Sequence, residues 1–199
     1  MNPRHFIRPI LLSLLILFPN LVYGTEVDSE KTSIEDRFLT ESALITGIGT
    51  SEISEGHYRP ILLIWHLGVD LKKYFPKMKA WEGSFSAHLE PQLNPVISPE
   101  TDFEFGIGLG VQYTHPLTDK LSIYISGSVG PHYISVVTIE QADGFLFSDA
   151  IGAGLYFFIT KNSALNLGYR LRHLSNAGFE QPNWGINTHF AIIGYTVFF

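Results

Sequence analysis

The feature that most constrains the fold is a two-residue alternation of apolar and polar side chains, which recurs from about residue 42 to the C-terminus. The stretch DFEFGIGLGVQY, residues 102–113, shows the pattern clearly. Every second residue is Phe, Ile, Leu, Val or Tyr, and the residues between them are Asp, Glu, Gly or Gln. Because successive residues of a strand point to opposite faces, each such stretch predicts a strand with one apolar wall and one polar or small wall.

The alternation predicts eight strands, separated by turn-forming sequences such as SPET, HPLTD, QADG and TKNSA. We expect them near residues 42–50, 58–69, 81–90, 102–114, 120–129, 145–158, 163–175 and 188–199. Segments of about ten residues suit a tilted strand that crosses a bilayer.

Two architectures accommodate eight alternating strands. A soluble sandwich or a lipocalin-like barrel turns the apolar wall inward, whereas a membrane barrel turns it outward toward lipid. The polar wall is rich in Gly, Ser, Asp, Glu and Arg, which suits a narrow polar lumen better than a solvent-facing surface. Aromatic residues at the ends of the apolar wall suit the interfacial girdles of a membrane barrel, and they are Trp81, Phe103, Tyr113 and Tyr169.

The C-terminus favours the same architecture. The chain ends in Phe199, with Val197, Tyr195 and Ile193 on the same side of the last strand. This pattern resembles the signal read by the machinery that inserts outer-membrane barrels. We therefore predict an all-β fold, an eight-stranded antiparallel transmembrane β-barrel of the outer membrane. Closure pairs every backbone group, as a bilayer requires.

With an even number of strands, the N-terminus and the C-terminus of the barrel domain both lie on the periplasmic side. The seventh strand then runs outward, so its end and residues 176–187 lie at the outer surface. Residues 71–79, LKKYFPKMK, form a periplasmic turn that is longer than usual. Its four lysines are either solvated or in contact with anionic headgroups.

The N-terminus predicts a secretory signal peptide over residues 1–24. Arg4, His5 and Arg8 form a basic start, Ile10–Phe18 form an apolar core, and we expect cleavage after Gly24. A retained membrane anchor is the alternative, but the apolar run is shorter than the roughly 20 residues that a spanning helix needs. Residues 25–40 form a polar leader, and residues 41–199 form the barrel domain.

Charge and composition exclude several classes of function. Loss of two arginines with the signal lowers the 13 Lys and Arg to 11 against 19 Asp and Glu, a formal net charge of −8. Such an acidic chain is a poor partner for nucleic acid. The absence of cysteine excludes disulfides and thiolate metal sites. No metal site or cofactor is predicted, because metal-ligand spacing is lacking among His57, His66, His88, His115, His132 and His189.

The seventh predicted strand places two polar residues on the apolar wall. His173 and Ser175 continue the alternating series Leu165, Leu167, Tyr169, Leu171. Counting back from Phe199 brings Asn187 of the last strand to the same face. Arg170 and Arg172 point into the lumen, where their candidate partners are Asp102 with Glu104, or Glu82 with Glu90.

Histidine and serine two residues apart on one face permit acyl transfer. A serine hydroxyl is a weak nucleophile, and a histidine within hydrogen-bond reach can take its proton as attack begins. A third group, here Asn187, holds the imidazole in the right tautomer. Asn176 and the backbone N–H groups around Ala177–Gly178 are candidate donors to the oxyanion. The spacing alone is weak evidence, but polar residues on a lipid-facing wall normally carry a cost.

The stretch YRLRHLSNAGFEQPNWGIN, residues 169–187, resembles the signature of the outer-membrane lipid A 3-O-deacylases. That signature runs Tyr-Arg-x-x-His-x-Ser-Asn-Ala-Gly, followed by Pro-Asn-x-Gly before the last strand. The matching positions are Tyr169, Arg170, His173, Ser175, Asn176, Ala177, Gly178, Pro182, Asn183 and Gly185.

The resemblance implies an eight-stranded barrel that hydrolyses the ester-linked 3-hydroxyacyl chain at the 3 position of lipid A. It implies that Ser175 is the nucleophile, that His173 is the base, and that Asn176 helps to form the oxyanion hole. Gly178 and Asn183 are further candidates for oxyanion or substrate positioning. The implied partners are lipopolysaccharide and the outer membrane, and the sequence leaves open whether the barrel forms a homodimer.

One position departs from the family. The family has a glutamate two residues after the glycine of Pro-Asn-x-Gly, where this chain has Asn187. An amide can orient histidine but adds no negative charge, and the Asp→Asn change in a serine protease costs about 10⁴ in turnover. Three outcomes stay open: a slower enzyme that uses the amide, one that recruits another acid such as Glu180, or a barrel that has lost activity.

We favour a working hydrolase, because the histidine, the serine and the following asparagine are all retained. A non-enzymatic structural or adhesive barrel with a decayed site is one alternative. An esterase that acts on another membrane lipid, such as a phospholipid, is the other.

Overall fold

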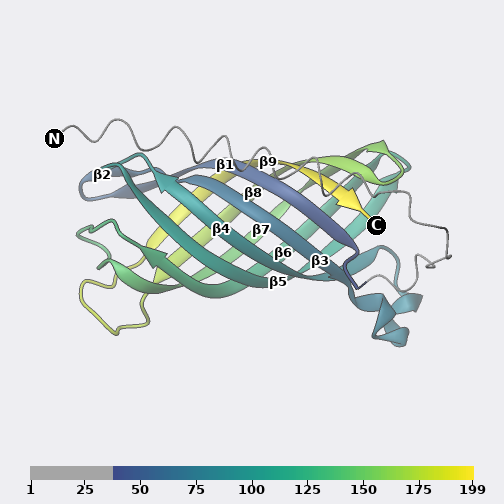
Figure 1. Ribbon diagram of the computed structural model, residues 1–199, viewed down its shortest axis with the longest axis horizontal. Coiled ribbons are helices and arrows are strands. Elements are labelled where there is room, and N and C mark those ends of the chain that lie inside the picture. Colours follow the sequence, from purple (N-terminus) through teal and green to yellow (C-terminus); the bar gives the residue numbers. More distant parts are fainter. Residues whose placement is uncertain (1–37) are drawn as a thin grey trace, which may run out of the picture. The chain divides into compact units, whose positions relative to one another are not determined.

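The computed structural model describes residues 38–199, so the predicted signal peptide and residues 25–37 of the predicted leader lie outside the described part of the chain. Antiparallel strands follow one another in chain order, and the last strand pairs with the first to close a barrel (Figure 1). The strands are β1 (Glu41–Ile53), β2 (Gly56–Tyr58), β3 (Ile61–Asp70), β4 (Ser84–Val96), β5 (Asp102–Thr118), β6 (Leu121–Ile134), β7 (Gly144–Thr160), β8 (Ser163–Ser175) and β9 (Ile186–Phe198).

The short strand β2 is an outward extension of β3. It pairs only with the end of β1, and Pro60 separates it from β3. Proline has no N–H to donate to the ladder, so regular pairing is interrupted there, although the Pro60 carbonyl accepts the Gly49 N–H at 2.9 Å. With β2 and β3 counted as one strand, the barrel has the eight strands that the alternation predicts.

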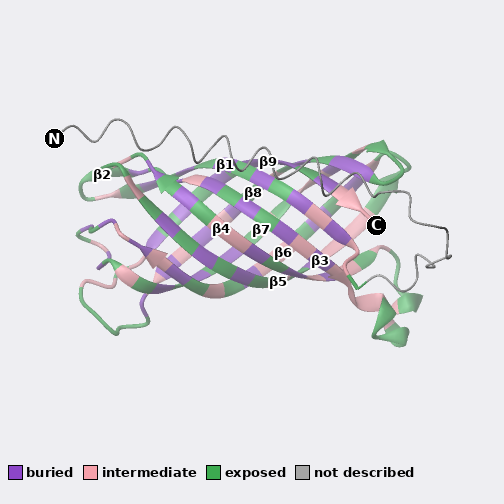
Figure 2. Ribbon diagram, viewed as in Figure 1, coloured by how far each residue is buried: buried purple, intermediate pink, exposed green. Residues whose placement is uncertain are grey.

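Burial alternates along every long strand (Figure 2). On β5 the apolar side chains point outward and are half exposed to solvent, for example Leu109 and Val111 at 59% each. The polar side chains between them point into the lumen, where Glu104 is fully buried. An apolar outer wall with a polar interior is the arrangement of a transmembrane barrel and the reverse of a lipocalin-like barrel. The predicted orientation is therefore confirmed.

Part of the lumen is apolar as well. A buried cluster lines the inside of β1, β3 and β9, and its members are Ala43, Ile45, Leu62, Ile64, Phe190 and Ile192. These strands carry apolar residues on both faces, so the clean alternation seen in β5 weakens there. The Arg172 guanidinium lies 5.0 Å from the centre of the Phe190 ring, where the polar and apolar parts of the lumen meet.

The turn between β3 and β4 contains two 3-10 helices, η2 (Leu71–Lys73) and η3 (Pro76–Ala80). The β4 strand begins at Ser84 rather than at Trp81, where the alternation starts in the sequence. Gly83 has a φ of +76°, and the Lys72 ammonium donates to the carbonyls of Trp81 and Gly83. The carbonyls of Trp81 and Gly83 are therefore bonded to Lys72 within the turn. Within residues 38–199, no helix is long and apolar enough to cross a bilayer.

Candidate active site

Three polar residues lie side by side on the outer wall, near the end of the barrel opposite the C-terminus. In the sheet register, His173 of β8 pairs with Asn187 of β9 on one side and with Asp149 of β7 on the other. His173 is half-buried, and Asn187 and Asp149 are exposed on the outside. The wall that faces lipid elsewhere is thus interrupted by a short polar row.

His173 is oriented by a hydrogen bond between its Nδ1 and the Oδ1 of Asn187, at 2.8 Å. An amide oxygen only accepts, so the imidazole Nδ1–H donates and Nε2 carries the free lone pair. This is the tautomer that a general base needs when its Nε2 faces the nucleophile. The predicted pairing of His173 with Asn187 is present in the structure.

The Nε2 edge of His173 faces Gly185. A Cβ placed on Gly185 would lie 2.4 Å from the imidazole Cε1 and 3.0 Å from Nε2, and Gly185 has a φ of +78°. The pairing of Leu174 with Ile186, followed one residue further, brings Gly185 level with Ser175. The Nε2 edge of His173 therefore faces the residue that precedes β9, in space that only a glycine leaves open.

Ser175 is the last residue of β8, is half-buried, and pairs with Phe147 of β7. No hydrogen bond joins its hydroxyl to His173 in the described chain. Residues two apart on a strand have Cα atoms about 6.6 Å apart, and their side chains share a face. Catalytic hydrogen bonds are often long without substrate and shorten when it binds, so the arrangement permits the contact.

The loop after Ser175 is held by Asn176, which is 2% exposed. Its backbone N–H donates to Asn183 Oδ1 at 2.9 Å, and its Nδ2 donates to the Glu180 carbonyl at 2.9 Å. Its Oδ1 accepts the Gly178 N–H at 3.0 Å. Asn176 and Asn183 therefore lock the loop into a tight turn, and one hydrogen of the Asn176 amide is left to donate elsewhere.

Ala177 adopts a φ of +55°, the only positive φ of a non-glycine residue in the described part of the chain. Such a conformation is uncommon for a residue with a Cβ and often marks a functional site. The N–H groups of Asn176, Gly178 and Phe179 are all hydrogen-bonded within the loop. The Ala177 N–H has no partner among the described residues, so it is an uncommitted backbone donor two residues after Ser175.

Glu180, considered from the sequence as a replacement acid, lies exposed in this loop. Its backbone carbonyl accepts from Asn176. Among residues 38–199, no hydrogen bond or ion pair joins its carboxylate to His173. The geometry therefore gives His173 an amide partner on Nδ1 and brings no contact from Glu180.

Two hollows on the outer wall flank the His173–Asn187 pair. The larger one, here called the apolar hollow, has a volume of about 680 Å³ and is lined by Leu109, Gly110, Val111, Gly127, Ser128, Val129, Asp149, Ala150, Ile151, Leu171, His173 and Asn187. Gly127 leaves space between Ile125 and Val129 along the outer side of β6. The smaller one, the polar hollow, has a volume of about 360 Å³ and is lined by Thr50, Ser51, Glu52, Gly185, Asn187 and His189.

The loops at this end of the barrel are tied to one another. Glu140, in the loop between β6 and β7, accepts from the Ser54 N–H at 2.7 Å and from the Ser54 hydroxyl at 2.6 Å. The Glu140 carbonyl accepts the Trp184 N–H at 2.7 Å, and Ala142 donates to the Pro182 carbonyl at 2.9 Å. These bonds connect the β1–β2 hairpin to the loop that carries Asn183 and Gly185.

The same contacts affect the ionisation of Glu140. Its slight burial raises the pKa, but the two hydrogen bonds from Ser54 favour the carboxylate, and the pKa of Glu140 ends below its ordinary value of 4.5. Glu140 is therefore held as an acceptor at neutral pH.

The two arginines of β8 point into the lumen, as predicted. Arg170 pairs with Glu90, and Arg172 pairs with Glu104 in a two-pronged contact of 2.5 and 3.1 Å. Glu82 and Asp102, the other candidate partners, do not pair with them. Asp102 accepts a hydrogen bond from Ser135 instead.

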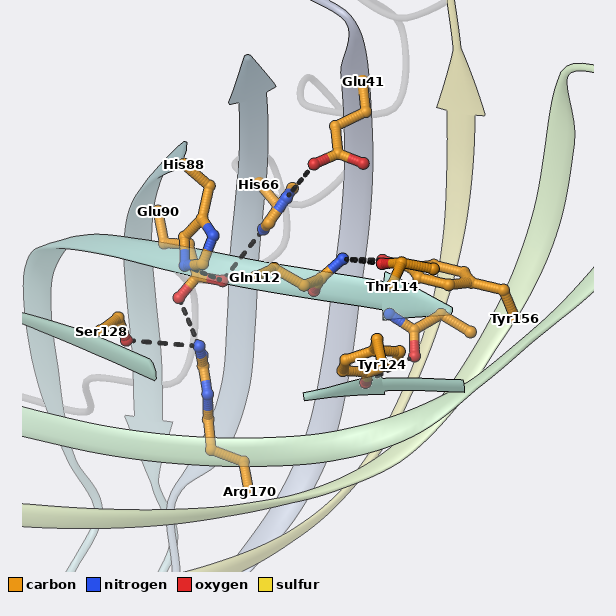
Figure 3. A network of polar contacts seen from close by, with 11 residues as sticks. Glu41, His66, His88, Glu90, Gln112, Thr114, Tyr124, Ser128, Tyr156 and Arg170 are labelled. Carbon is orange, nitrogen blue, oxygen red and sulfur yellow. Dashed lines mark hydrogen bonds and ion pairs between the residues drawn. The ribbon is translucent and has the colours of Figure 1, made fainter. Parts of the chain in front are cut away.

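Figure 3 shows how the pair Arg170–Glu90 continues into a larger network. His66 lies between two carboxylates, with Nδ1 at 3.0 Å from Glu90 and Nε2 at 3.3 Å from Glu41. His66, His88 and Glu90 offer three buried ligand atoms within 4.8 Å of one another. This grouping could not be predicted from the sequence, because the residues come from β3 and β4 and meet only through the register.

The charges of this network balance without a further ion. The carboxylates of Glu41 and Glu90 lie at the two ring nitrogens of His66, and the guanidinium of Arg170 pairs with Glu90. With His66 protonated, the two negative and two positive charges cancel. Glu90 is held by both Arg170 and His66. The network is buried in the lumen and lies on the opposite side of the barrel wall from His173.

Sequence reasoning missed two residues beside the imidazole, Asp149 and Gly185. Gly185 entered only as a motif match, since its approach to His173 depends on the loop conformation. A signal for Asp149 was present, because it is the only charged residue in the outward-facing series that begins Phe145, Phe147 and continues through Ile151 to Phe157.

Comparison with known proteins agrees with this picture. Residues 64–196 match the model of the family described as lipid A 3-O-deacylase (PagL). No curated protein matches the sequence.

Several solved structures resemble the barrel, including the following two. The outer membrane enzyme PagL is 20% identical, with 79% of this chain and 98% of that chain covered and a TM-score of 0.54. Neisserial surface protein A is 12% identical, with 80% and 96% covered and a TM-score of 0.56. At these identities the likeness shows the fold, which is that of an outer-membrane β-barrel, as the sequence predicts.

Proposed function

The chain belongs to the family of lipid A 3-O-deacylases, and from this premise we propose that it is an outer-membrane esterase that removes the 3-O-linked acyl chain of lipid A. The observation that carries the proposal is the orientation of His173 on the outer wall. Its Nδ1 is hydrogen-bonded to Asn187, and its Nε2 edge faces Gly185 at the level of Ser175. A base and a nucleophile on the lipid-facing wall can reach an ester of a lipid that remains in the membrane.

In the proposed mechanism, Ser175 Oγ attacks the ester carbonyl carbon while His173 Nε2 takes the hydroxyl proton. The tetrahedral intermediate collapses when the C–O bond to the sugar breaks and His173 returns the proton to the leaving sugar oxygen. Water then attacks the acyl-serine while His173 takes its proton, the bond from the acyl carbon to Ser175 Oγ breaks, and His173 returns the proton to Oγ as the 3-hydroxy fatty acid leaves. Asn187 keeps the proton on Nδ1 throughout, and the reaction needs no cofactor.

The oxyanion of each intermediate requires hydrogen-bond donors beside Ser175. The Ala177 N–H is uncommitted, and the Asn176 amide retains one hydrogen after donating to Glu180. We assign these two groups to the oxyanion hole. Gly178 and Asn183 act indirectly, because they hold Asn176 in place.

The two hollows differ in polarity, so each suits a different part of the substrate. The apolar hollow suits the acyl chain, since its walls are aliphatic and begin at His173. The polar hollow suits the glucosamine side of the ester, since Thr50, Glu52 and His189 offer donors and acceptors to sugar hydroxyls. The scissile ester then lies between the hollows, beside Ser175.

The test is mass spectrometry of lipid A from cells that express the full chain. The expected result is loss of one 3-hydroxy fatty acid per lipid A, and Ser175→Ala should abolish it. A matched control is Ser148→Ala, at nearly the same height but on the lumen side of β7, which should leave the loss unchanged. Unmodified lipid A in cells with correctly folded wild-type barrel would refute the proposal.

A non-enzymatic barrel is the second candidate, and the amide at Asn187 in place of an acid is what favours it. It predicts that wild type and Ser175→Ala leave the same lipid A. A third candidate, an esterase for another lipid, predicts that Ser175-dependent fatty acid release appears with defined phospholipids rather than with lipid A.

A further inference from the structure

Asp149 occupies a position where a carboxylate is costly. It is the only charged residue on the outward face of β7, where its neighbours along the strand are Phe147 and Ile151. Across the sheet it pairs with Val129 of β6 on one side and with His173 of β8 on the other. A charge on the lipid-facing wall destabilises a membrane barrel unless something compensates it, and His173 is its one polar neighbour in these four directions.

The register sets the separation of the two residues at Cβ, and among the described residues no ion pair within 4.0 Å joins the two side chains. Residues directly opposite each other in an antiparallel pair have Cβ atoms about 4.5–5.5 Å apart. Asp149 and His173 are such a pair, and both point outward beside the apolar hollow. Asn187 approaches the imidazole from the other side through β9. His173 is thus flanked by an amide on one side and a carboxylate on the other.

We propose that Asp149 is a positioning residue for the reaction and that its carboxylate supplies the negative charge that stabilises protonated His173. The assignment rests on the proposed esterase function. It divides between two residues the roles that one acid performs in a serine triad: Asn187 orients the imidazole through Nδ1, and Asp149 provides the charge.

The physical reason lies in what happens during attack. When Ser175 gives its proton to His173, the imidazole becomes a cation in a wall that is otherwise apolar. A carboxylate on the neighbouring strand stabilises that cation, and the effect is larger in a low-dielectric setting than in water. In this role Asp149 transfers no proton. Before attack, the cost of the exposed carboxylate is already present in the folded barrel.

The test uses the full chain, refolded in detergent micelles with purified lipopolysaccharide, and measures release of 3-hydroxy fatty acid. Asp149→Asn keeps the shape and removes the charge. Since a neighbouring opposite charge favours an ionised form by about 10- to 1000-fold, kcat should fall by about 10- to 100-fold with KM little changed. Asp119→Asn, the same change in the turn at the other end of the barrel, should have no effect.

A second variant separates charge from structure. Asn187→Glu places a carboxylate on the other side of His173. The double variant Asp149→Asn with Asn187→Glu should therefore have a kcat at least tenfold higher than that of Asp149→Asn alone. A role in packing or in substrate binding gives no such rescue. The electrophoretic shift of heated against unheated barrel checks that each variant folds.

The outcomes distinguish this inference from the proposed function. If wild type releases no fatty acid and matches Ser175→Ala, the proposed function fails. If wild type is active and Asp149→Asn is equally active, the assignment of Asp149 fails alone. If folded Asp149→Asn is impaired but Asn187→Glu restores nothing, or if KM rather than kcat changes, the charge role is overturned.

Discussion

The imidazole of His173 and the amide of Asn187 are joined by a 2.8 Å hydrogen bond across β8 and β9. The two residues are direct cross-strand partners, so the contact follows from the sheet register and requires no loop to place it. This rigidity fixes the tautomer of His173 before substrate arrives. It also separates orientation from charge, because an amide accomplishes only the first.

Replacement of Asn187 by leucine tests the orienting role. Leucine has similar size but accepts no hydrogen bond, so Nδ1 loses its partner and the imidazole can rotate or change tautomer. We expect kcat to fall by about 100-fold or more, within the range attributed to a positioned general base. Asn187→Glu should leave activity intact or raise it. Fatty acid release from lipopolysaccharide measures both, and a leucine variant with wild-type kcat would contradict the orienting role.

Gly185→Ala should reduce activity without unfolding the barrel. The added Cβ would lie 2.4 Å from the His173 Cε1, and a φ of +78° strains any residue with a Cβ. The imidazole must shift, so kcat should fall by about tenfold or more, as small displacements of catalytic groups cost this much. Gly178→Ala is the control. It also has a positive φ, of +84°, but nothing lies within 4 Å of its Cβ, so it shares the strain without the clash.

Gly127→Leu should impair activity by filling the apolar hollow. Gly127 lines this hollow on the outer side of β6, and the only atom near its added Cβ is the Ala150 carbonyl oxygen at 3.8 Å. The larger side chain fits the barrel but occupies the space assigned to the acyl chain. We expect a higher KM for long acyl chains and a smaller effect on short ones. Ala153→Leu, on the outer side of β7 but outside the hollow, should leave both unchanged. If Gly127→Leu has the same kinetics as wild type, the acyl chain does not bind in this hollow.

Much of the barrel could be predicted because one physical rule governs it. The alternation of Phe103, Phe105 and Ile107 with polar residues fixes which face meets lipid, and the same parity places His173 and Ser175 outside and Arg170 inside. Strand ends were less accurate. The β4 strand continues to Val96 through Pro91 and Pro95, which read as turn residues in a sequence but are accommodated within the strand here.

Most contacts between strands could not be predicted, because they depend on register; the contact of His173 with Asn187 is an exception. That Arg172 pairs with Glu104 rather than with Asp102 is decided by the height of each residue in the barrel, which no single strand encodes. For the same reason the sequence did not bring Asp149 beside His173. The loop positions were beyond prediction for another reason, since the bonds of Asn176 depend on backbone turns with positive φ at Ala177 and Gly178.

The pair Arg172–Glu104 makes the lumen sensitive to single substitutions. Both residues are at most 1% exposed, and Glu104 also accepts from Tyr58 and Asn94. Arg172→Met leaves a buried carboxylate without its cation, which costs about 3–5 kcal/mol of unfolding free energy. Arg172→Met with Glu104→Gln should lose less than the sum of the single changes. Denaturant unfolding in detergent measures all three, and additive losses would argue against a coupled pair.

Acid should loosen the loops above the site through Glu140. Because the pKa of Glu140 in the folded chain lies below its ordinary value of 4.5, the Ser54–Glu140 tie contributes fully above pH 4.5 and is lost as the pH falls through the lowered pKa. The protection of residues 135–143 and 182–184 against hydrogen exchange, measured relative to the intrinsic exchange rate at each pH, should therefore be high at neutral pH and fall below about pH 4.5. Ser54→Ala removes one of the two bonds and should weaken this pH dependence. Ser98→Ala, which removes a bond to the His57 carbonyl, should leave the pH dependence of these loops unchanged. Protection that falls equally with acid in wild type and Ser54→Ala would show that another group controls the loops.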